Sequence, residues 1–134
     1  MNKKIQKEPD GELMIRTLAM PADANPNGDI FGGWLVSQMD LAGLALAVET
    51  AKSRATTVAI DSMVFLHPVL VGDFICCYAK LLKVGRTSMR IKVQVFAITQ
   101  GHTERHQVTE GQFTYVALDE QRKPQPVVRE AHAK

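Results

Sequence analysis

One acidic residue stands inside the most apolar helical stretch of the chain. Asp40 lies near the middle of residues 33–51, which contain no proline and in which Ala and Leu dominate. Carboxylates are seldom buried unless they are hydrogen-bonded or functional. A carboxylate in such surroundings is suited to act as a general base or as a nucleophile. The sequence leaves open a second interpretation, a structural carboxylate that accepts hydrogen bonds from a neighbouring strand.

The elements that must position Asp40 are a loop and a long helix. Residues 25–29, Asn-Pro-Asn-Gly-Asp, are rich in turn formers and precede the apolar stretch. We predict a helix from Gly33 to about Ala51, roughly 27 Å long. At 100° per residue, Gly33, Ser37 and Asp40 fall on one polar stripe. Apart from this stripe and Gln38, the helix surface is almost entirely apolar, which predicts a helix buried on nearly all sides.

Strands are predicted on either side of this helix. Residues 87–98 alternate apolar and polar side chains most regularly, which is the strongest strand pattern in the chain. The predicted strands are residues 13–20, 56–66, 74–84, 87–98 and 106–118. Because strands joined by short turns pair antiparallel, we predict an α+β fold with one long helix wrapped by a five-stranded antiparallel sheet.

Composition restricts the class of protein. The chain has 134 residues, of which 46% are hydrophobic and 22% charged, with a net charge of +2. One domain at residues 12–119 is predicted, with a flexible tail at 1–11 and a polar tail at 120–134. Balanced charge does not favour nucleic-acid binding. Without an apolar run of spanning length or a signal peptide, we predict a cytoplasmic protein that does not bind membranes.

The cysteine, histidine and serine residues offer no competing active site. Cys76 and Cys77 are adjacent, so on a strand they point to opposite faces, and they lack the spaced partners of a zinc site. We predict buried packing thiols and no metal. His67, like the chain's other histidines, is expected to be solvated or structural. Ser37 lies one turn from Asp40 and is a candidate hydrogen-bond partner, but no G-x-S-x-G sequence supports a serine nucleophile.

Three pieces of the sequence resemble the hotdog-fold acyl-CoA thioesterases. They are N-G-D-I-F-G-G-W at residues 27–34, M-D at residues 39–40 and V-A-I-D-S-M-V-F-L-H-P-V-L-V-G-D at residues 58–73. The resemblance is closest to the bacterial YciA type and runs from about residue 10 to residue 119. It implies hydrolysis of acyl-CoA to a free acid and coenzyme A, with broad acyl-chain tolerance and no metal or cofactor. It also implies a homodimer with one continuous sheet, assembled further into a hexamer as a trimer of dimers.

The resemblance assigns roles to four residues. Asp40 matches the catalytic carboxylate, and Asn25 matches a loop amide that orients water or the thioester. Gly32 and Gly33 match the start of the helix, where backbone N–H groups polarise the thioester carbonyl. Physical chemistry agrees, because the first helical turn has unpaired N–H groups at the positive end of the dipole. Such donors, aimed at a developing oxyanion, are usually the largest catalytic contribution.

The spacing of these residues predicts a site shared between subunits. Gly32 and Asp40 are eight positions apart, which is about 12 Å along one helix. One carbonyl carbon cannot easily meet both groups from the same helix. We therefore expect the amides and Asn25 on one subunit and Asp40 on its dimer partner, which agrees with the resemblance.

The predicted binding site for coenzyme A is a turn between two strands. It resembles the hotdog segment near the nucleotide end of the substrate, and an ordinary charged turn is the alternative interpretation. The candidate residues are Lys83, Gly85, Arg86, Thr87 and Ser88. Gly85 would let backbone amides face a phosphate, and Arg86 could pair with it through two hydrogen bonds. Arg54, just after the helix, is a secondary candidate.

Three other functions compete with acyl-CoA hydrolysis. A non-catalytic acyl-CoA binding or sensing module on the same fold would not need Asp40 beside a thioester. A hotdog dehydratase would need a catalytic histidine, and residues 25–33 contain none. A structural oligomerisation domain would leave Asn25, Gly32 and Asp40 unexplained. The sequence does not choose between Asp40 as general base and Asp40 as nucleophile.

Overall fold

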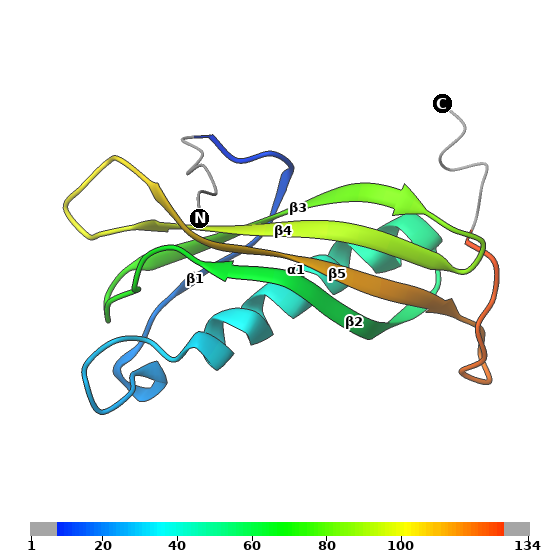
Figure 1. Cartoon of the computed structure of the whole chain (residues 1–134), viewed down its shortest axis with the longest axis horizontal. Coiled ribbons are helices and arrows are strands. Elements are labelled where there is room, and N and C mark those ends of the chain that lie inside the picture. The colour runs from blue at the N-terminus through cyan, green and yellow to red at the C-terminus, as the bar shows by residue number, and fades with distance from the viewer. Residues whose placement is uncertain (1–7, 128–134) are drawn as a thin grey trace.

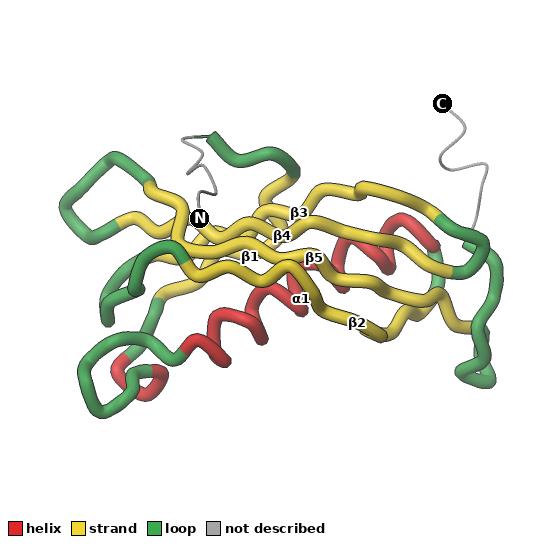
Figure 2. The backbone as a smooth tube through the Cα atoms, viewed as in Figure 1, coloured by secondary structure: helices red, strands yellow, loops and turns green. Residues whose placement is uncertain are grey.

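The computed structural model describes residues 8–127, in which one long helix lies across five strands (Figures 1 and 2). In chain order the elements are β1 (Glu12–Leu18), the short 3-10 helix η1 (Pro21–Asp23), α1 (Gly32–Ala51), β2 (Arg54–Phe65), β3 (Phe74–Val84), β4 (Ser88–Ile98) and β5 (His106–Leu118). The predicted order of elements and the α+β fold class are confirmed. The bounds of β3 and β5 agree with the prediction at both ends.

The five strands form one antiparallel sheet in the order β1-β3-β4-β5-β2. β4 is central, and its row of Met89, Ile91, Val93 and Val95 is fully buried against the helix side. The alternation predicted for this strand therefore places these apolar side chains on the helix side of the sheet and the intervening side chains on its outer face. The sheet ends in two edges, β1 and β2. Within residues 8–127, nothing pairs with the outer side of the twelve-residue β2.

α1 packs one face on the sheet and leaves the opposite face uncovered in a single chain. The buried residues of α1 are Leu35, Met39, Ala42, Gly43, Leu46, Ala47, Thr50 and Ala51. By contrast, Leu41 is 53% exposed and Val48 is 40% exposed. The prediction of a helix buried on nearly all sides is therefore wrong for one chain, because the sheet covers one face only. Apolar side chains left outside are typical of a surface that a second subunit covers.

The two ends of α1 are built differently. The helix begins at Gly32, and the N-cap residue Phe31 provides no side-chain acceptor for the first-turn N–H groups. At the other end Lys52 adopts a left-handed conformation with φ 55° and donates its N–H to the Val48 carbonyl at 2.8 Å. This cap stops the helix and leads directly into β2, which starts at Arg54.

The outer face of the sheet, opposite α1, is polar and holds the beginning of the described chain. Asp10 lies 3.0 Å from Lys80 on β3 and 2.8 Å from Lys92 on β4. Asp10 therefore holds this segment on the sheet, while Glu8 and Gly11 stay exposed. The remainder of the predicted N-terminal tail, residues 1–7, lies outside the described residues.

The segment after β5 also returns to the sheet. Gln125 donates its N–H to the Ala117 carbonyl at 2.9 Å, and Val127 donates to the Arg86 carbonyl at 2.9 Å. Val127 is buried in the core, with 2% of its surface exposed. Val127 and these two backbone hydrogen bonds dock an otherwise polar segment on the sheet. The polar composition of the segment did not indicate this contact. Residues 128–134 lie outside the described residues.

Three further properties concern residues 8–127 only. None of their helices combines the length and the hydropathy needed to cross a membrane. No group of three or more His, Cys, Asp or Glu side chains among them is placed to hold a metal ion. Cys76 and Cys77 are buried free thiols, as predicted. The cytoplasmic location stays a prediction.

Candidate active site

Asp40 lies half-buried in the middle of α1 and contacts β2 and β5. Thr57 Oγ1 on β2 donates a hydrogen bond of 2.6 Å to Oδ1 of Asp40. The Tyr115 hydroxyl on β5 lies 3.0 Å from the same oxygen and 2.8 Å from the backbone carbonyl oxygen of Asp40. Both partners are neutral hydroxyl groups, so they orient the carboxylate without cancelling its charge.

The second carboxylate oxygen of Asp40 is available. In the described part of the chain no hydrogen bond reaches Oδ2, and no buried side-chain oxygen or nitrogen is without a partner. Oδ2 is therefore open to solvent in a single chain. The two oxygens of Asp40 therefore differ: Oδ1 is anchored to neighbouring strands, and Oδ2 has no hydrogen-bond partner within the described residues.

The hydroxyl groups near Asp40 have distinct roles. Tyr115 is fully buried, and burial together with the nearby Asp40 charge raises the pKa of its hydroxyl far above the usual range. It therefore stays protonated and donates. Ser37 instead donates to the Trp34 carbonyl at 2.7 Å, so the hydrogen bond considered between Ser37 and Asp40 does not form. A helical serine commonly satisfies its hydroxyl on the preceding turn in this way.

Asn25 organises the loop before α1 with its main chain and its side chain. Its backbone N–H donates to the Asp29 carbonyl at 2.7 Å, and its carbonyl accepts from Gly28 at 3.0 Å. Oδ1 accepts from the backbone N–H groups of Asn27 at 2.9 Å and Asp29 at 3.2 Å. Two donors fix that atom as the oxygen. The Nδ2 donor group makes no hydrogen bond to residues 8–127 and can serve another molecule.

The first backbone N–H groups of α1 are also unpaired. Trp34 and Leu35 both donate to the Phe31 carbonyl, at 3.1 and 3.3 Å. The N–H groups of Gly32 and Gly33 precede this pattern and have no partner within the described residues. A Cβ on Gly33 would meet no atom within 4 Å. Glycine weakens a helix relative to alanine, so packing within the described residues does not account for Gly33.

A cleft of about 350 Å³, the loop cleft, lies between the start of α1 and the end of β2. Its lining includes Asn25, Asp29, Gly32, Phe65, His67 and Pro68. Two of the predicted site residues, Asn25 and Gly32, therefore share one cavity. Gly33 and Asp40 do not line it. A single chain thus separates the loop donors from the carboxylate, as the spacing along the helix predicted.

His67 is a lining residue that sequence reasoning set aside. Its Nδ1 lies 3.2 Å from the Gln107 carbonyl oxygen, and its ring meets the His106 ring edge-on at 5.7 Å. The structure places it in the loop cleft with Asn25 and Gly32. The sequence feature that could have indicated this position is Pro68, because a proline restricts the residue before it to an extended or turn conformation.

The turn predicted to bind coenzyme A joins β3 to β4, at the opposite end of the sheet from the start of α1 (Figure 1). The Gly85 N–H donates to the Ser88 carbonyl at 2.8 Å, and a Cβ on Gly85 would lie 2.7 Å from Ser88 Oγ. The tight turn therefore favours glycine at this position, and the Gly85 N–H is used within the turn. Lys83, Gly85 and Ser88 line a cleft of about 250 Å³, in which Arg86 and Thr87 take no part.

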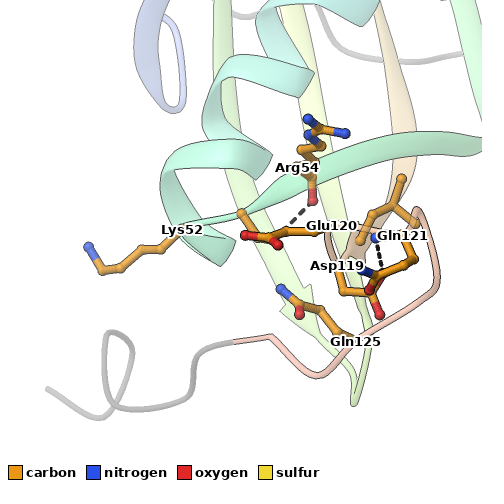
Figure 3. A pocket seen from close by; sticks show the side chains of 8 residues that line it. Lys52, Arg54, Asp119, Glu120, Gln121 and Gln125 are labelled. Carbon is orange, nitrogen blue, oxygen red and sulfur yellow. Dashed lines mark hydrogen bonds between the residues drawn. The ribbon is translucent and has the colours of Figure 1, made fainter.

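A larger polar cleft of about 470 Å³ lies at the same end of the sheet (Figure 3). Lys52 and Arg54, next to the end of α1 and at the start of β2, line it on one side, with the Lys52 side chain pointing away from the cleft. Asp119, Glu120, Gln121 and Gln125 line it from the segment after β5. Asp119 Oδ1 accepts two backbone N–H groups of its own turn, at 2.8 and 2.9 Å. The secondary candidate Arg54 therefore stands in a cleft of mixed charge, apart from Lys83 and Ser88.

Comparison with known proteins identifies the family. Residues 27–103 match the Thioesterase superfamily. The acyl-CoA thioester hydrolase YciA of Salmonella typhimurium is 52% identical over 122 residues, which cover 89% of this chain and 92% of that protein. The hexameric thioesterase y2039 from Yersinia pestis superposes with a TM-score of 0.87 at 50% identity, over 90% of this chain and 99% of that chain.

A third relative links the fold to a carboxylate. The structure of HI0827, a hexameric broad specificity acyl-coenzyme A thioesterase, was solved as an aspartate-to-alanine mutant enzyme. It superposes with a TM-score of 0.87 at 49% identity, over 90% of this chain and 89% of that chain. A single long helix across a five-stranded antiparallel sheet agrees with the hotdog fold named for a hexameric thioesterase of Campylobacter jejuni, which superposes with a TM-score of 0.85 at 43% identity. The chain belongs to the Thioesterase superfamily, which confirms the resemblance drawn from its sequence.

Proposed function

We propose that this chain, an acyl-CoA thioester hydrolase, combines Asp40 of one subunit with the loop cleft of its dimer partner. The reaction adds water across the C–S bond, so the acyl group leaves as a carboxylic acid and coenzyme A as a thiol. The observation that carries the proposal is the separation of the catalytic groups. Asn25 and Gly32 share the loop cleft, whereas Asp40 lies eight positions along α1 and does not line it.

Asp40 has the chemistry that the reaction needs. Its Oδ1 is held by Thr57 and Tyr115, and its Oδ2 is free. Oδ2 can take a proton from an attacking water, or it can attack the thioester carbonyl itself and form an anhydride. Both routes use the same oxygen. A non-catalytic binding module would gain nothing from a free carboxylate at this position.

The donors in the loop cleft and at the start of α1 fit the other half of the reaction. In both routes negative charge develops on the carbonyl oxygen of the thioester. The unpaired N–H groups of Gly32 and Gly33 lie at the positive end of the α1 dipole. Asn25 Nδ2 adds a neutral donor close to them. Donors fixed before the reaction stabilise this charge without reorganisation, which is the main catalytic contribution in such sites.

A dimer through β2 would bring the two halves together. β2 is an edge strand of twelve residues and exposes apolar Val58 and Ile60. Pairing β2 with its copy across a twofold axis extends the sheet to a continuous one and covers these side chains. Asp40 contacts Thr57 on the same strand, so it lies beside this axis. The exposed Leu41 and Val48 of α1 give the partner helix an apolar surface.

The same twofold arrangement accounts for the distant β3–β4 turn. A rotation about an axis near the middle of β2 exchanges the two ends of the sheet. Lys83 and Arg86 of one subunit then approach the loop cleft of the other. Both side chains are exposed cations without an ion-pair partner among residues 8–127, so they can meet phosphates. Thr87 and Ser88 add hydroxyl groups, and Gly85 shapes the turn.

The proposed oligomeric state and acyl-chain specificity are based on the compared relatives. The compared thioesterases of known structure are hexameric, and one of them has broad specificity. We propose a trimer of dimers for this chain and tolerance of acyl chains of different lengths. The chemistry above uses carboxylate, amide and water alone, so the proposal needs no metal and no cofactor besides the coenzyme A of the substrate.

Mixed dimers test the shared site. Asp40→Ala and Asn25→Ala subunits with different affinity tags are co-expressed, and oligomers containing both are isolated by two successive purifications. Each variant alone should release no thiol from an acyl-CoA. In a mixed dimer one site has lost both groups and the other has kept both. Thiol release should therefore return to about half of the wild-type rate per mixed dimer.

A matched control mixes Asp40→Ala with Asp40→Asn subunits, which should stay inactive in every combination. If the Asp40→Ala and Asn25→Ala mixture forms mixed dimers and still releases no thiol, the shared site is wrong. Activity in pure Asp40→Ala oligomers would instead overturn the role of Asp40.

A further inference from the structure

We propose that Tyr115 is a positioning residue, which fixes the orientation of the Asp40 carboxylate so that Oδ2 faces the substrate. This inference rests on the proposed catalytic role of Asp40. The Tyr115 hydroxyl lies within hydrogen-bond distance of two oxygens of Asp40, the backbone carbonyl at 2.8 Å and Oδ1 at 3.0 Å. It therefore ties the side chain of Asp40 to the backbone of the same residue, and this restricts rotation of the carboxylate.

The sheet places this hydroxyl with little freedom. Tyr115 and Thr57 are directly opposite each other in the register of β5 and β2. Their two hydroxyls converge on Oδ1 from neighbouring strands. The Tyr115 ring is fully buried and stacks on Phe113, with ring centres 6.3 Å apart and planes at 13°. A buried ring in a stacked pair holds its hydroxyl at one position.

The helix is shaped to admit this hydroxyl. A Cβ on Gly43 would lie 2.2 Å from the Tyr115 hydroxyl oxygen and 2.9 Å from two carbons of its ring. No side chain larger than hydrogen therefore fits at Gly43 while Tyr115 reaches Asp40. Glycine in a helix interior is unfavourable relative to alanine, so its presence here needs a local reason. The contact between Tyr115 and Asp40 supplies that reason.

A merely structural role predicts something different. A buried tyrosine hydroxyl must have a partner, and the backbone carbonyl of Asp40 alone would satisfy it. The additional approach to Oδ1 connects it to the group that reacts. Loss of the hydroxyl should then change turnover, not only stability, because a misplaced catalytic group costs rate even when substrate binding is unchanged.

The test is Tyr115→Phe, which keeps the stacked ring and removes the donor. We expect kcat to fall by about tenfold to a hundredfold, with KM within about twofold of wild type. Tyr78→Phe is the matched control, because Tyr78 stacks edge-on with Phe96 and has no contact with Asp40. Its kcat should not change. A wild-type kcat in folded Tyr115→Phe would overturn the inference.

A double variant separates this inference from the proposed function. If Tyr115 acts through Asp40, Tyr115→Phe should not lower the residual rate of Asp40→Asn any further. A further loss of the same size as in the wild-type background would overturn the positioning role. If Asp40→Asn itself keeps the wild-type kcat, the proposed function fails and not merely the role of Tyr115.

Two tyrosine analogues keep the test decisive if Tyr115→Phe does not fold. At position 115, 4-methylphenylalanine fills the same volume without a donor, and 4-aminophenylalanine retains a donor at the same place. The methyl analogue should lose kcat as described, and the amino analogue should restore it to within about threefold of wild type. Equal kcat values in the two analogues would overturn the inference.

Discussion

The carboxylates on the two faces of the sheet have different kinds of partner. On the outer face Asp10 is paired with Lys80 and Lys92, and hydrogen bonds from Lys92 and then Lys80 lower the pKa of Asp10. On the helix face Asp40 meets two neutral hydroxyl groups, and no cation among residues 8–127 pairs with it. The outer carboxylate is thus paired with cations, whereas the inner one is oriented by neutral donors.

Under the proposed function, this difference separates a structural carboxylate from a reactive one. An exposed ion pair contributes modestly to stability. In Asp10, each carboxylate oxygen is paired with a lysine. A carboxylate with one anchored and one free oxygen can instead exchange a proton or form a bond. The type of partner therefore carries more information about function than the depth of burial.

The largest expected effect compares Asp40→Asn with Asp10→Asn. Asp40→Asn retains the shape of the side chain and removes its basicity, so thiol release from an acyl-CoA should fall at least about a thousandfold. Asp10→Asn breaks two ion pairs far from α1, so kcat should stay at the wild-type value. Its melting temperature should fall by no more than a few degrees. Equal losses of activity in the two variants would contradict the contrast between the faces.

A smaller effect is expected from two glycines of the same helix. Gly43→Ala places a methyl group 2.2 Å from the Tyr115 hydroxyl, so we expect destabilisation of about 1–3 kcal/mol in urea unfolding. Gly33→Ala meets no atom within 4 Å in its own chain and improves helix propensity. It should leave the free energy of unfolding unchanged or higher while it lowers activity. A destabilised, fully active Gly33→Ala variant would show that the space beside Gly33 serves packing.

The smallest effect concerns the adjacent thiols, which lie on the two faces of β3. Burial raises the pKa of Cys77 from its ordinary value of 9.0 to about 12. The unfolded chain ionises this thiol above pH 9 and the folded chain does not. The free energy of unfolding is therefore undiminished below pH 9 and falls between about pH 9 and about pH 12. The loss is at most about 1.4 kcal/mol per pH unit.

Cys77→Ala should remove this dependence, which urea unfolding of both proteins at about pH 8 and about pH 10.5 would measure. Cys76→Ala is the control. Burial also raises the pKa of Cys76, but the nearby Arg16 and Arg105 oppose the rise. Its substitution should therefore change the pH dependence less. A larger change of pH dependence in Cys76→Ala than in Cys77→Ala would contradict the assignment of the two thiols to the two faces of β3.

Much of the fold was predictable because it depends on local patterns. Period-two alternation defined β4, and a proline-free run rich in Ala and Leu defined α1. The unusual placement of Asp40 in that run, with Asn25 and the Gly32–Gly33 pair before it, indicated the site. These signals are carried by neighbours in the chain, so propensity and spacing suffice to find them.

Contacts between distant segments were not predictable in this way. Thr57 and Tyr115 follow Asp40 by 17 and 75 positions, and only strand register brings them to one carboxylate oxygen. A tyrosine on the inner row of β5 was the available signal, because its buried hydroxyl must find a partner. Likewise the sequence did not show that the Gly85 N–H donates to the Ser88 carbonyl within the β3–β4 turn.

The sequence by itself determined the order of elements and the class of enzyme, because these follow from local periodicity and from short motifs. The tertiary structure decided which oxygen of Asp40 is anchored, which donors share the loop cleft and which apolar surfaces remain uncovered. The physical reason is that hydrogen-bond geometry and burial depend on residues that pairing of the strands brings together from far apart in the chain.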